Sequence, residues 1–280
     1  MKLTYNPFTL LLTSYVLVNA IHVHHSIYLS AADLHAHQHA KKDTVRITIL
    51  YDNYVFAKGT NADWGFSCLI ENTEKTILFD TGSDPDILMR NVRALNKDLS
   101  QIDVVVISHN HGDHTGGLNE VLQHTEHIDI YLPYSTPHKY MEQIEGVEVT
   151  WHRKKDFSQI CKNAYLTGEL GDNIPEQSLI LDTENGLVVI TGCSHPGIVH
   201  IVRTVGNLFG KDIYLVLGGF HLMQHSTGKI REINKELKDF GVQKCGPTHC
   251  TGDEAIQLFK TSFGDDFIQL GTGQTIGIAP

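Results

Sequence analysis

The chain has 280 residues, of which 41% are hydrophobic and 19% are charged, an ordinary balance for a globular protein. This length is enough to bury a sizeable core in one layered domain. The formal net charge is −10, and lysine and arginine are not clustered as counterion-release binding to nucleic acids requires. We therefore expect no nucleic-acid partner.

The first 20 residues predict an export signal. Lys2 gives a minimal positive start, and residues 8–18 (FTLLLTSYVLV) form an apolar run of signal-peptide length. The run is short for a bilayer span, so we expect no stable membrane anchor. The alternative is a hydrophobic N-terminal helix of the folded domain. The protein is expected to be periplasmic or secreted in the first case and cytoplasmic in the second.

Residues 21–43 form a histidine-rich linker that contains six of the 18 histidines. Such tracts can capture metal ions, but this one can equally be a solvated linker with no specific role. Residues 44–280 are expected to form a single domain.

Five cysteines are an odd number in a chain of this size, which argues against a disulfide scaffold. Cys245 and Cys250 are close enough in sequence to form one pair, whereas Cys68 and Cys161 are expected to be buried thiols. Cys193 is interpreted as a small buried side chain, with a reactive thiol as the alternative.

Two series of strands followed by helices define the fold class. Residues 45–50, 66–70 and 76–79 predict an antiparallel start, and a helix at 84–96 leads to an apolar strand at 102–107. The second half repeats the pattern, with strands at 178–181, 187–190 and 213–217 and helices at 197–208 and 229–240. This order predicts an α/β fold in which two sheets pack face to face with helices outside, an αββα four-layer sandwich.

A dense group of metal-binding residue types follows the strand at 102–107, in the segment SHNHGDHTGG. His109 and His111 alternate and can point the same way on an extended chain, so one ion can bind both. Asp113 and His114 lie beyond a glycine, where the chain can turn toward a second ion. Imidazole and carboxylate ligands suit zinc, and also iron or manganese. The segment predicts one or two metal ions.

A catalytic zinc ion typically has three protein ligands, so further histidines are expected at other strand ends. Three later histidines lie in turn-rich segments: His195 in GCSHPG, His221 in GGFHL and His249 in PTHCTG. An ion with an open position lets bound water become hydroxide near neutral pH and act as a nucleophile. The pattern predicts an enzyme that hydrolyses an ester, phosphoester or amide in a small-molecule substrate.

The motif HxHxDH, followed by these later histidines, resembles the metallo-β-lactamase superfamily. The preceding ILFDTG is similar to that superfamily's first motif, whose aspartate, here Asp80, supports the ligands from behind. The resemblance implies that the first metal is held by His109, His111 and His195, and the second by Asp113, His114 and His249. The segments GCSHPG, GGFHL, PTHCTG and WGFSCLIE are similar to the subgroup named for 7,8-dihydropterin-6-methyl-4-(β-D-ribofuranosyl)aminobenzene-5′-phosphate synthase.

One position departs from the superfamily pattern. The superfamily usually has a bridging aspartate where this chain has the strand 213–217 followed by GGFH, without a carboxylate. His221 would then replace the bridge, bind one ion, or donate a proton to the substrate. Asp113 and His221 are the candidates for direct catalytic roles. Loops at 57–64 and 153–177 are expected to set specificity, and Asn53 either faces the pocket or is a turn residue.

Two other functions remain open at this stage. A resembling branch uses a similar ligand set to hold two irons for redox chemistry, although it carries a flavin domain for which 280 residues leave no room. An exported metal-binding or metal-delivery protein is favoured by the histidine-rich tract and the missing aspartate. The oligomeric state is not predicted by the sequence.

Overall fold

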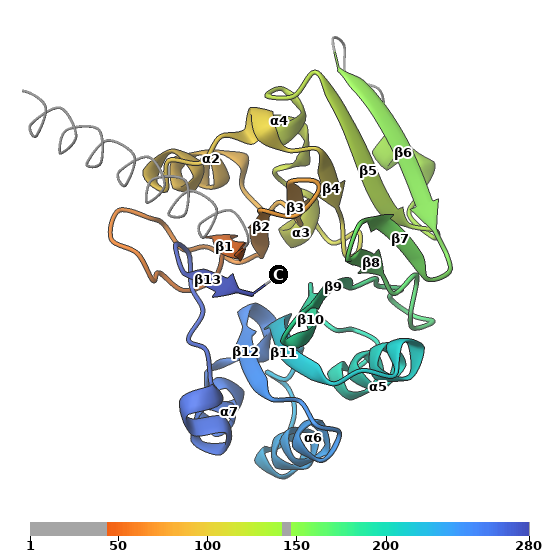
Figure 1. Ribbon diagram of the computed structural model, residues 1–280. Helices are drawn as coiled ribbons and strands as arrows, with labels where there is room; N and C mark the ends of the chain where they lie inside the picture. Colours follow the sequence, from red (N-terminus) through yellow and green to blue (C-terminus); the bar gives the residue numbers. More distant parts are fainter. Residues whose placement is uncertain (1–43, 142–146, 280) are drawn as a thin grey trace, which may run out of the picture. The chain divides into compact units, whose positions relative to one another are not determined.

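The computed structural model describes residues 44–141 and 147–279 (Figure 1). The predicted signal peptide and the histidine-rich linker lie outside the described residues. Within the described ranges, none of the helices is both long and apolar enough to cross a membrane.

The first sheet has seven strands in the order β13-β1-β2-β3-β4-β5-β6. Its first three strands in the chain pair antiparallel, as predicted, and the pairs from β3 to β6 are parallel. The strands are β1 (Val45–Tyr51), β2 (Ser67–Glu71), β3 (Ile77–Phe79), β4 (Val104–Val106), β5 (His127–Pro133), β6 (Glu148–Lys154) and β13 (Thr275–Ile278).

The second sheet has six strands in the order β12-β11-β10-β9-β8-β7. The pairs of β10 with β11 and of β11 with β12 are parallel, so these three strands end at the same edge. The strands are β7 (Ser158–Cys161), β8 (Ala164–Leu166), β9 (Leu179–Thr183), β10 (Gly186–Thr191), β11 (Ile213–Gly219) and β12 (Lys244–Thr248).

The two sheets pack face to face with helices on their outer faces, which confirms the predicted αββα sandwich (Figure 1). Successive residues of a strand point to opposite faces. In β3, Ile77 and Phe79 therefore pack between the sheets, while Leu78 packs outward. Apolar residues of α2 (Pro85–Ala94) and α4 (Leu118–Leu122) cover the first sheet. The second is covered by α5 (Ile198–Phe209), α6 (Thr227–Asp239) and α7 (Asp253–Phe263).

Capping residues explain where two predicted helices begin. The side chain of Asp84 accepts a hydrogen bond from the N–H of Ile87, and Pro85 occupies the first turn of α2. Ser226 caps α6 in the same way, by accepting from the N–H of Lys229. The α6 helix therefore begins at Thr227, two residues before the predicted start.

Two expectations are wrong. Residues 153–177, expected to be an irregular loop, contain β7 and β8. The sequence did not predict these strands because three or four residues carry too short an alternation to detect. The suggested pairing of Cys245 with Cys250 does not form, since all five cysteines are free and buried. Cys68 and Cys161 are buried thiols, as expected.

A buried carboxylate joins the ends of β1 and β12, which belong to different sheets. Asp52 follows β1, is fully buried, and accepts hydrogen bonds from the Thr248 hydroxyl at 2.6 and 2.8 Å. Burial raises the pKa of Asp52 to about 7, although the Thr248 hydroxyl and neighbouring N–H groups act in the opposite direction. The native state therefore holds this proton more tightly than the unfolded chain does.

This shift predicts a pH dependence of folding. The contribution of protonated Asp52 to the free energy of unfolding is fully present below pH ~3.9. It decreases as the pH rises through about 7, by about 4 kcal/mol in total. Urea unfolding of the chelator-treated chain at pH 4 to 7.5 measures it. The free energy of unfolding of Asp52→Asn should not show this loss, so the difference in favour of the variant should grow to about 4 kcal/mol as the pH rises from 4 to 7.5. The exposed control Asp265→Asn should follow wild type, and an Asp52→Asn profile parallel to wild type would contradict the assignment.

Candidate metal centre

The first set of donor atoms comes from the turn after β4 and the loop after β10. Nε2 of His109 and Nδ1 of His111 are 3.0 Å apart. The ring centroid of His195 lies 4.8 Å from that of His109 and 5.0 Å from that of His111. Two nitrogens bound to one tetrahedral ion at about 2.0–2.1 Å lie roughly 3.3 Å apart. The set therefore has the spacing that a shared metal ion requires.

The second set lies beside the first and joins α3 (Gly112–Thr115) to the loop after β12. Oδ2 of Asp113 is 3.3 Å from Nε2 of His249 and 3.6 Å from Nε2 of His114. His114 and His249 are fully buried. The structure thus brings together both groups of residues that the sequence resemblance assigned to two metals.

Two buried nitrogens indicate that these sets fit metal ions. Nε2 of His195 and Nε2 of His249 have no hydrogen-bond partner among the described residues. A buried polar atom without a partner is costly, and a metal ion would satisfy both. Burial also lowers the pKa of His195 to about 4 and that of His109 well below its ordinary value. Both rings are therefore neutral at pH 7, the form that binds metals.

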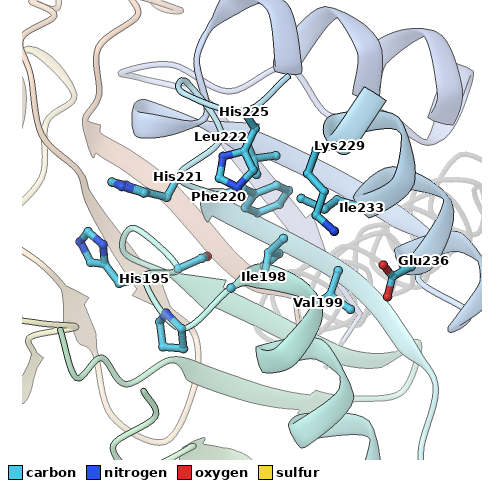
Figure 2. A pocket seen from close by; sticks show the side chains of 13 residues that line it. His195, Ile198, Val199, Phe220, His221, Leu222, His225, Lys229, Ile233 and Glu236 are labelled. Atoms are coloured by element: carbon cyan, nitrogen blue, oxygen red, sulfur yellow. The ribbon is translucent and has the colours of Figure 1, made fainter. Parts of the chain in front are cut away.

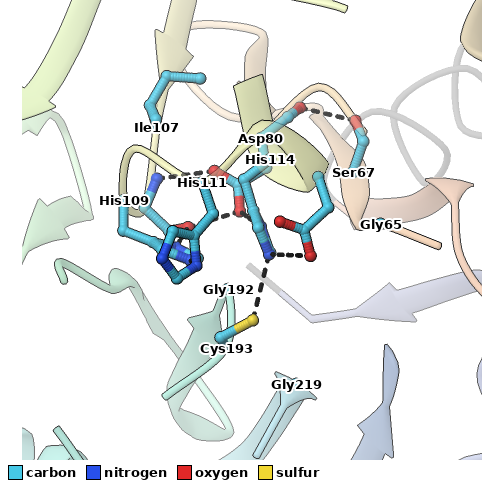
Figure 3. A network of polar contacts seen from close by, with 12 residues as sticks. Gly65, Ser67, Asp80, Ile107, His109, His111, His114, Gly192, Cys193 and Gly219 are labelled. Atoms are coloured by element: carbon cyan, nitrogen blue, oxygen red, sulfur yellow. Dashed lines mark hydrogen bonds and ion pairs between the residues drawn. The ribbon is translucent and has the colours of Figure 1, made fainter. Parts of the chain in front are cut away.

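Asp80 orients one histidine of each set (Figure 3). Its Oδ2 lies 2.7 Å from Nδ1 of His114 and accepts from the Ser108 hydroxyl, which lies 2.9 Å from Nδ1 of His109. Burial alone would lower the pKa of His114, but Asp80 raises that pKa to about 9. A carboxylate behind a ligating histidine fixes its ring and raises its basicity. This is the geometry expected for the supporting aspartate.

Glu176 is a supporting residue that sequence analysis missed. Its buried carboxylate accepts hydrogen bonds from the N–H groups of residues 192–195, at 2.9 to 3.1 Å. These four bonds hold the loop that presents His195. Glu176 lies in the stretch expected to be irregular, and no local motif distinguishes it from a surface glutamate.

Asn53 and Trp64 complete the surroundings of the second set. Oδ1 of Asn53 is 3.0 Å from Nδ1 of His249, which places Asn53 at the site rather than in an unrelated turn. The indole Nε1 of Trp64 donates to Oδ2 of Asp113 at 2.8 Å, and the ring lies 4.8 Å from that of His249. Trp64 belongs to the loop at 57–64 that was expected to shape specificity.

His221 follows β11 and lies beside the two donor sets rather than within either. Its ring is exposed and 4.5 Å from that of His195. Among the described residues its donor atom groups with the sulfurs of Cys193 and Cys250. Gly219 ends β11, so no side chain from the end of this strand enters the site.

The backbone is strained at four residues that follow strands ending near the site. Asp80, Ser194, His221 and His249 have φ angles of 55°, 61°, 53° and 51°. Left-handed conformations are uncommon for residues with a side chain, and they concentrate at functional sites. Each of these residues follows the end of a strand, and three of them contact or belong to the donor sets through the pairs of Asp80 with His114, His221 with His195 and His249 with Asp113.

A cavity of about 300 Å³ opens beside His195 and His221 (Figure 2). One side is formed by the apolar residues Ile198, Val199, Phe220 and Leu222. Ligand pockets in proteins are mostly apolar with few polar groups that orient the ligand. The cavity is therefore a candidate binding site for a small molecule next to the metal-binding residues.

Comparisons with known proteins agree with this geometry. The sequence profile of the metallo-β-lactamase superfamily matches residues 65–207. The chain is also 30% identical to the 7,8-dihydropterin-6-methyl-4-(β-D-ribofuranosyl)-aminobenzene-5′-phosphate synthase of Methanocaldococcus jannaschii. That match covers 84% of this chain and 97% of the relative. The chain therefore belongs to the metallo-β-lactamase superfamily, and the predicted resemblance is confirmed.

Two solved structures share the fold of this chain. A metal-dependent hydrolase of the β-lactamase superfamily superposes with a TM-score of 0.70 at 30% identity, covering 84% of this chain and all of that one. Zinc-bound PqqB of Methylobacterium extorquens has a TM-score of 0.53 at 12% identity, covering 82% and 99% of the two chains. The second comparison shows a common fold alone.

The role of Glu176 can be tested by replacement with glutamine. Glu176→Gln places an amide N–H₂ against backbone N–H groups, so the loop at 192–195 should loosen and the chain should lose about 1–3 kcal/mol of stability. Metal affinity should fall by about 10–100-fold, as for other partners of ligands. Chemical unfolding and metal titration measure both. Glu184→Gln, an exposed residue between β9 and β10, is the control. Equal metal affinities in both variants would exclude a supporting role.

Proposed function

We propose that the protein is a metal-dependent hydrolase that cleaves an ester, phosphoester or amide bond of a small molecule. The observation that carries the proposal is the meeting of two three-residue donor sets, spaced as metal ligands are, beside an apolar cavity. Membership of a superfamily that includes metal-dependent hydrolases supports it.

The donor chemistry favours zinc, with iron or manganese as alternatives. His109, His111 and His195 would hold one ion, and Asp113, His114 and His249 the second. A bound ion of this kind lowers the pKa of coordinated water and polarises the substrate's carbonyl or phosphoryl oxygen. Asp113 also accepts from the Trp64 indole, which keeps its carboxylate oriented.

His221 is proposed as the proton donor to the leaving group. Its hydrogen bond with Cys250 raises the pKa of His221 from its ordinary value, which favours the protonated form. It lines the cavity together with His195, so a molecule bound there would lie beside both residues (Figure 2). Exposure at the mouth of the cavity lets His221 exchange protons with solvent.

The compartment also remains a proposal. The apolar run at 8–18 favours export to the periplasm or the medium, where the histidine-rich linker would help capture metal. The M. jannaschii relative is named as a synthase of a pterin phosphate. We propose that this chain, if exported, acts on a different substrate with the same fold. Cell fractionation with and without residues 1–20 measures the compartment directly.

The central test removes one ligand. His111→Ala should lower turnover of chromogenic esters and phosphodiesters by more than about 100-fold. Replacing a residue that only hydrogen-bonds a metal ligand already lowers metal affinity or activity by about 10–100-fold. Metal content, measured on protein purified without added metal, should fall in parallel. His200→Ala replaces an exposed histidine of α5 and should keep both properties.

Other outcomes would replace the proposal. Tight stoichiometric metal without turnover on any substrate of the panel would favour metal binding or delivery. An iron spectrum that bleaches on reduction would favour a redox role. Unchanged turnover in His111→Ala would separate hydrolysis from this site altogether.

A further inference from the structure

One sulfur atom lies close to donor atoms of both donor sets of the metal centre. Among the described residues, Sγ of Cys193 lies within 4.8 Å of the donor atoms of a group formed by Asp113, His114 and His249. It lies within the same distance of the donors of His109 and His195. Its separation from Nε2 of His114 is 3.2 Å (Figure 3). No other side chain is common to these two groups of described residues.

We propose that the thiolate of Cys193 is a ligand shared by the two metal ions, in place of the bridging aspartate that the superfamily usually has where this chain has the end of β11. The inference rests on the metal centre of the proposed function but not on hydrolysis. A thiolate binds zinc at about 2.3 Å and replaces a carboxylate as an anionic ligand.

The end of β11 explains why the shared ligand comes from the loop after β10 instead. A Cβ atom built on Gly219 would lie 2.4 Å from the carbonyl oxygen of Gly192 and 2.7 Å from Sγ of Cys250. Both contacts are too close for any side chain at this position. The space that an aspartate from β11 would need is therefore filled by the loop that carries Cys193 and by the second thiol.

The position of Cys193 is fixed through its backbone. Its N–H donates to Glu176 at 2.9 Å, and its carbonyl oxygen accepts a weak hydrogen bond from the Cys250 thiol at 3.6 Å. The preceding Gly192 packs closely, since a Cβ there would lie 2.1 Å from Oγ of Ser108. Cys193 is only 3% exposed. The sulfur is thus held at the site, as a ligand must be.

A second, independent observation points to a ligand at this place. His249 is 0% exposed, and its Nε2 has no hydrogen-bond partner among the described residues. The same nitrogen falls in the donor group that contains Cys193. Cys250, in contrast, groups only with Cys193 and His221. The sulfur of Cys250 therefore lies outside both groups that contain residues of the two donor sets, while the sulfur of Cys193 belongs to both.

Cobalt(II) is the probe that tests the proposal, because a cobalt–thiolate bond produces an intense near-ultraviolet charge-transfer band that nitrogen and oxygen ligands do not. The full-length chain, loaded with cobalt after chelation, should show this band. Cys193→Ser should lose the band and bind cobalt at least about tenfold more weakly. Cys250→Ala and the core variant Cys68→Ala should keep the band, which separates a ligand from a nearby buried thiol.

Zinc X-ray absorption of the unmodified protein covers the case in which Cys193→Ser does not fold. A sulfur scatterer at about 2.3 Å is expected. Only nitrogen and oxygen scatterers, or a charge-transfer band that survives in Cys193→Ser, would overturn the proposal. A band that disappears in Cys250→Ala but persists in Cys193→Ser would identify Cys250 as the ligand and would also overturn the proposal. Since none of these readouts measures turnover, a thiolate ligand in an inactive protein would refute only the hydrolase.

Discussion

The site depends on the packing of two apolar sheet faces against each other. Residues such as Ile47, Phe79, Val106, Ile190 and Leu217 are buried in one core between the sheets. This burial removes apolar surface from water, the largest favourable contribution to folding. It also brings the ends of β3 and β4 from one sheet against the ends of β10, β11 and β12 from the other. Each donor set consequently draws residues from both sheets.

Buried carboxylates hold the loops at this junction in place. Asp52 links β1 to β12, Asp80 holds Ser108 and His114, and Glu176 accepts four N–H groups of the loop at 192–195. A buried charge is unfavourable unless several donors surround it. Each of these groups has such donors, which oppose but do not cancel the effect of burial on Asp52 and Glu176, whose pKa values are both raised to about 7. The loops that supply the donors gain a defined conformation. The donor atoms of the site are thereby pre-positioned.

A shared thiolate would change the metal preference of the centre. Sulfur is a soft ligand that favours zinc and iron(II) over manganese or magnesium, which prefer oxygen. It would also add a ligand to each ion, so substrate and water would bind through expansion to five-coordination. The apolar cavity beside His195 and His221 is where the organic part of the substrate would lie.

Much of the fold and the local metal motif was predictable because their causes are local. Apolar alternation located β1, a continuous apolar run located β10, and an Asp-Pro pair located the start of α2. The four metal-binding residue types from His109 to His114 stand within six positions after one strand. The superfamily motif added Asp80, His195 and His249. In β7 and β8, by contrast, three or four residues carry too little periodicity to predict a strand.

What only the tertiary structure decided is which isolated residues meet. Glu176 has no distinguishing sequence context, and Cys193, although it lies in the GCSHPG motif, was interpreted as a small buried side chain. The hydrogen bonds of Glu176 and the short distances from Cys193 to the donor atoms arise from the way the sheets pack. His221, for which a bridging, metal-binding or proton-donating role was predicted, lies beside the two three-residue donor sets, where its donor atom groups with the sulfurs of Cys193 and Cys250. The sequence by itself determined the fold class and seven candidate metal-binding residues, since periodicity, local motifs and the superfamily resemblance are all read along the chain. Contacts between segments distant in sequence depend on how the sheets pack, and only the folded structure shows them.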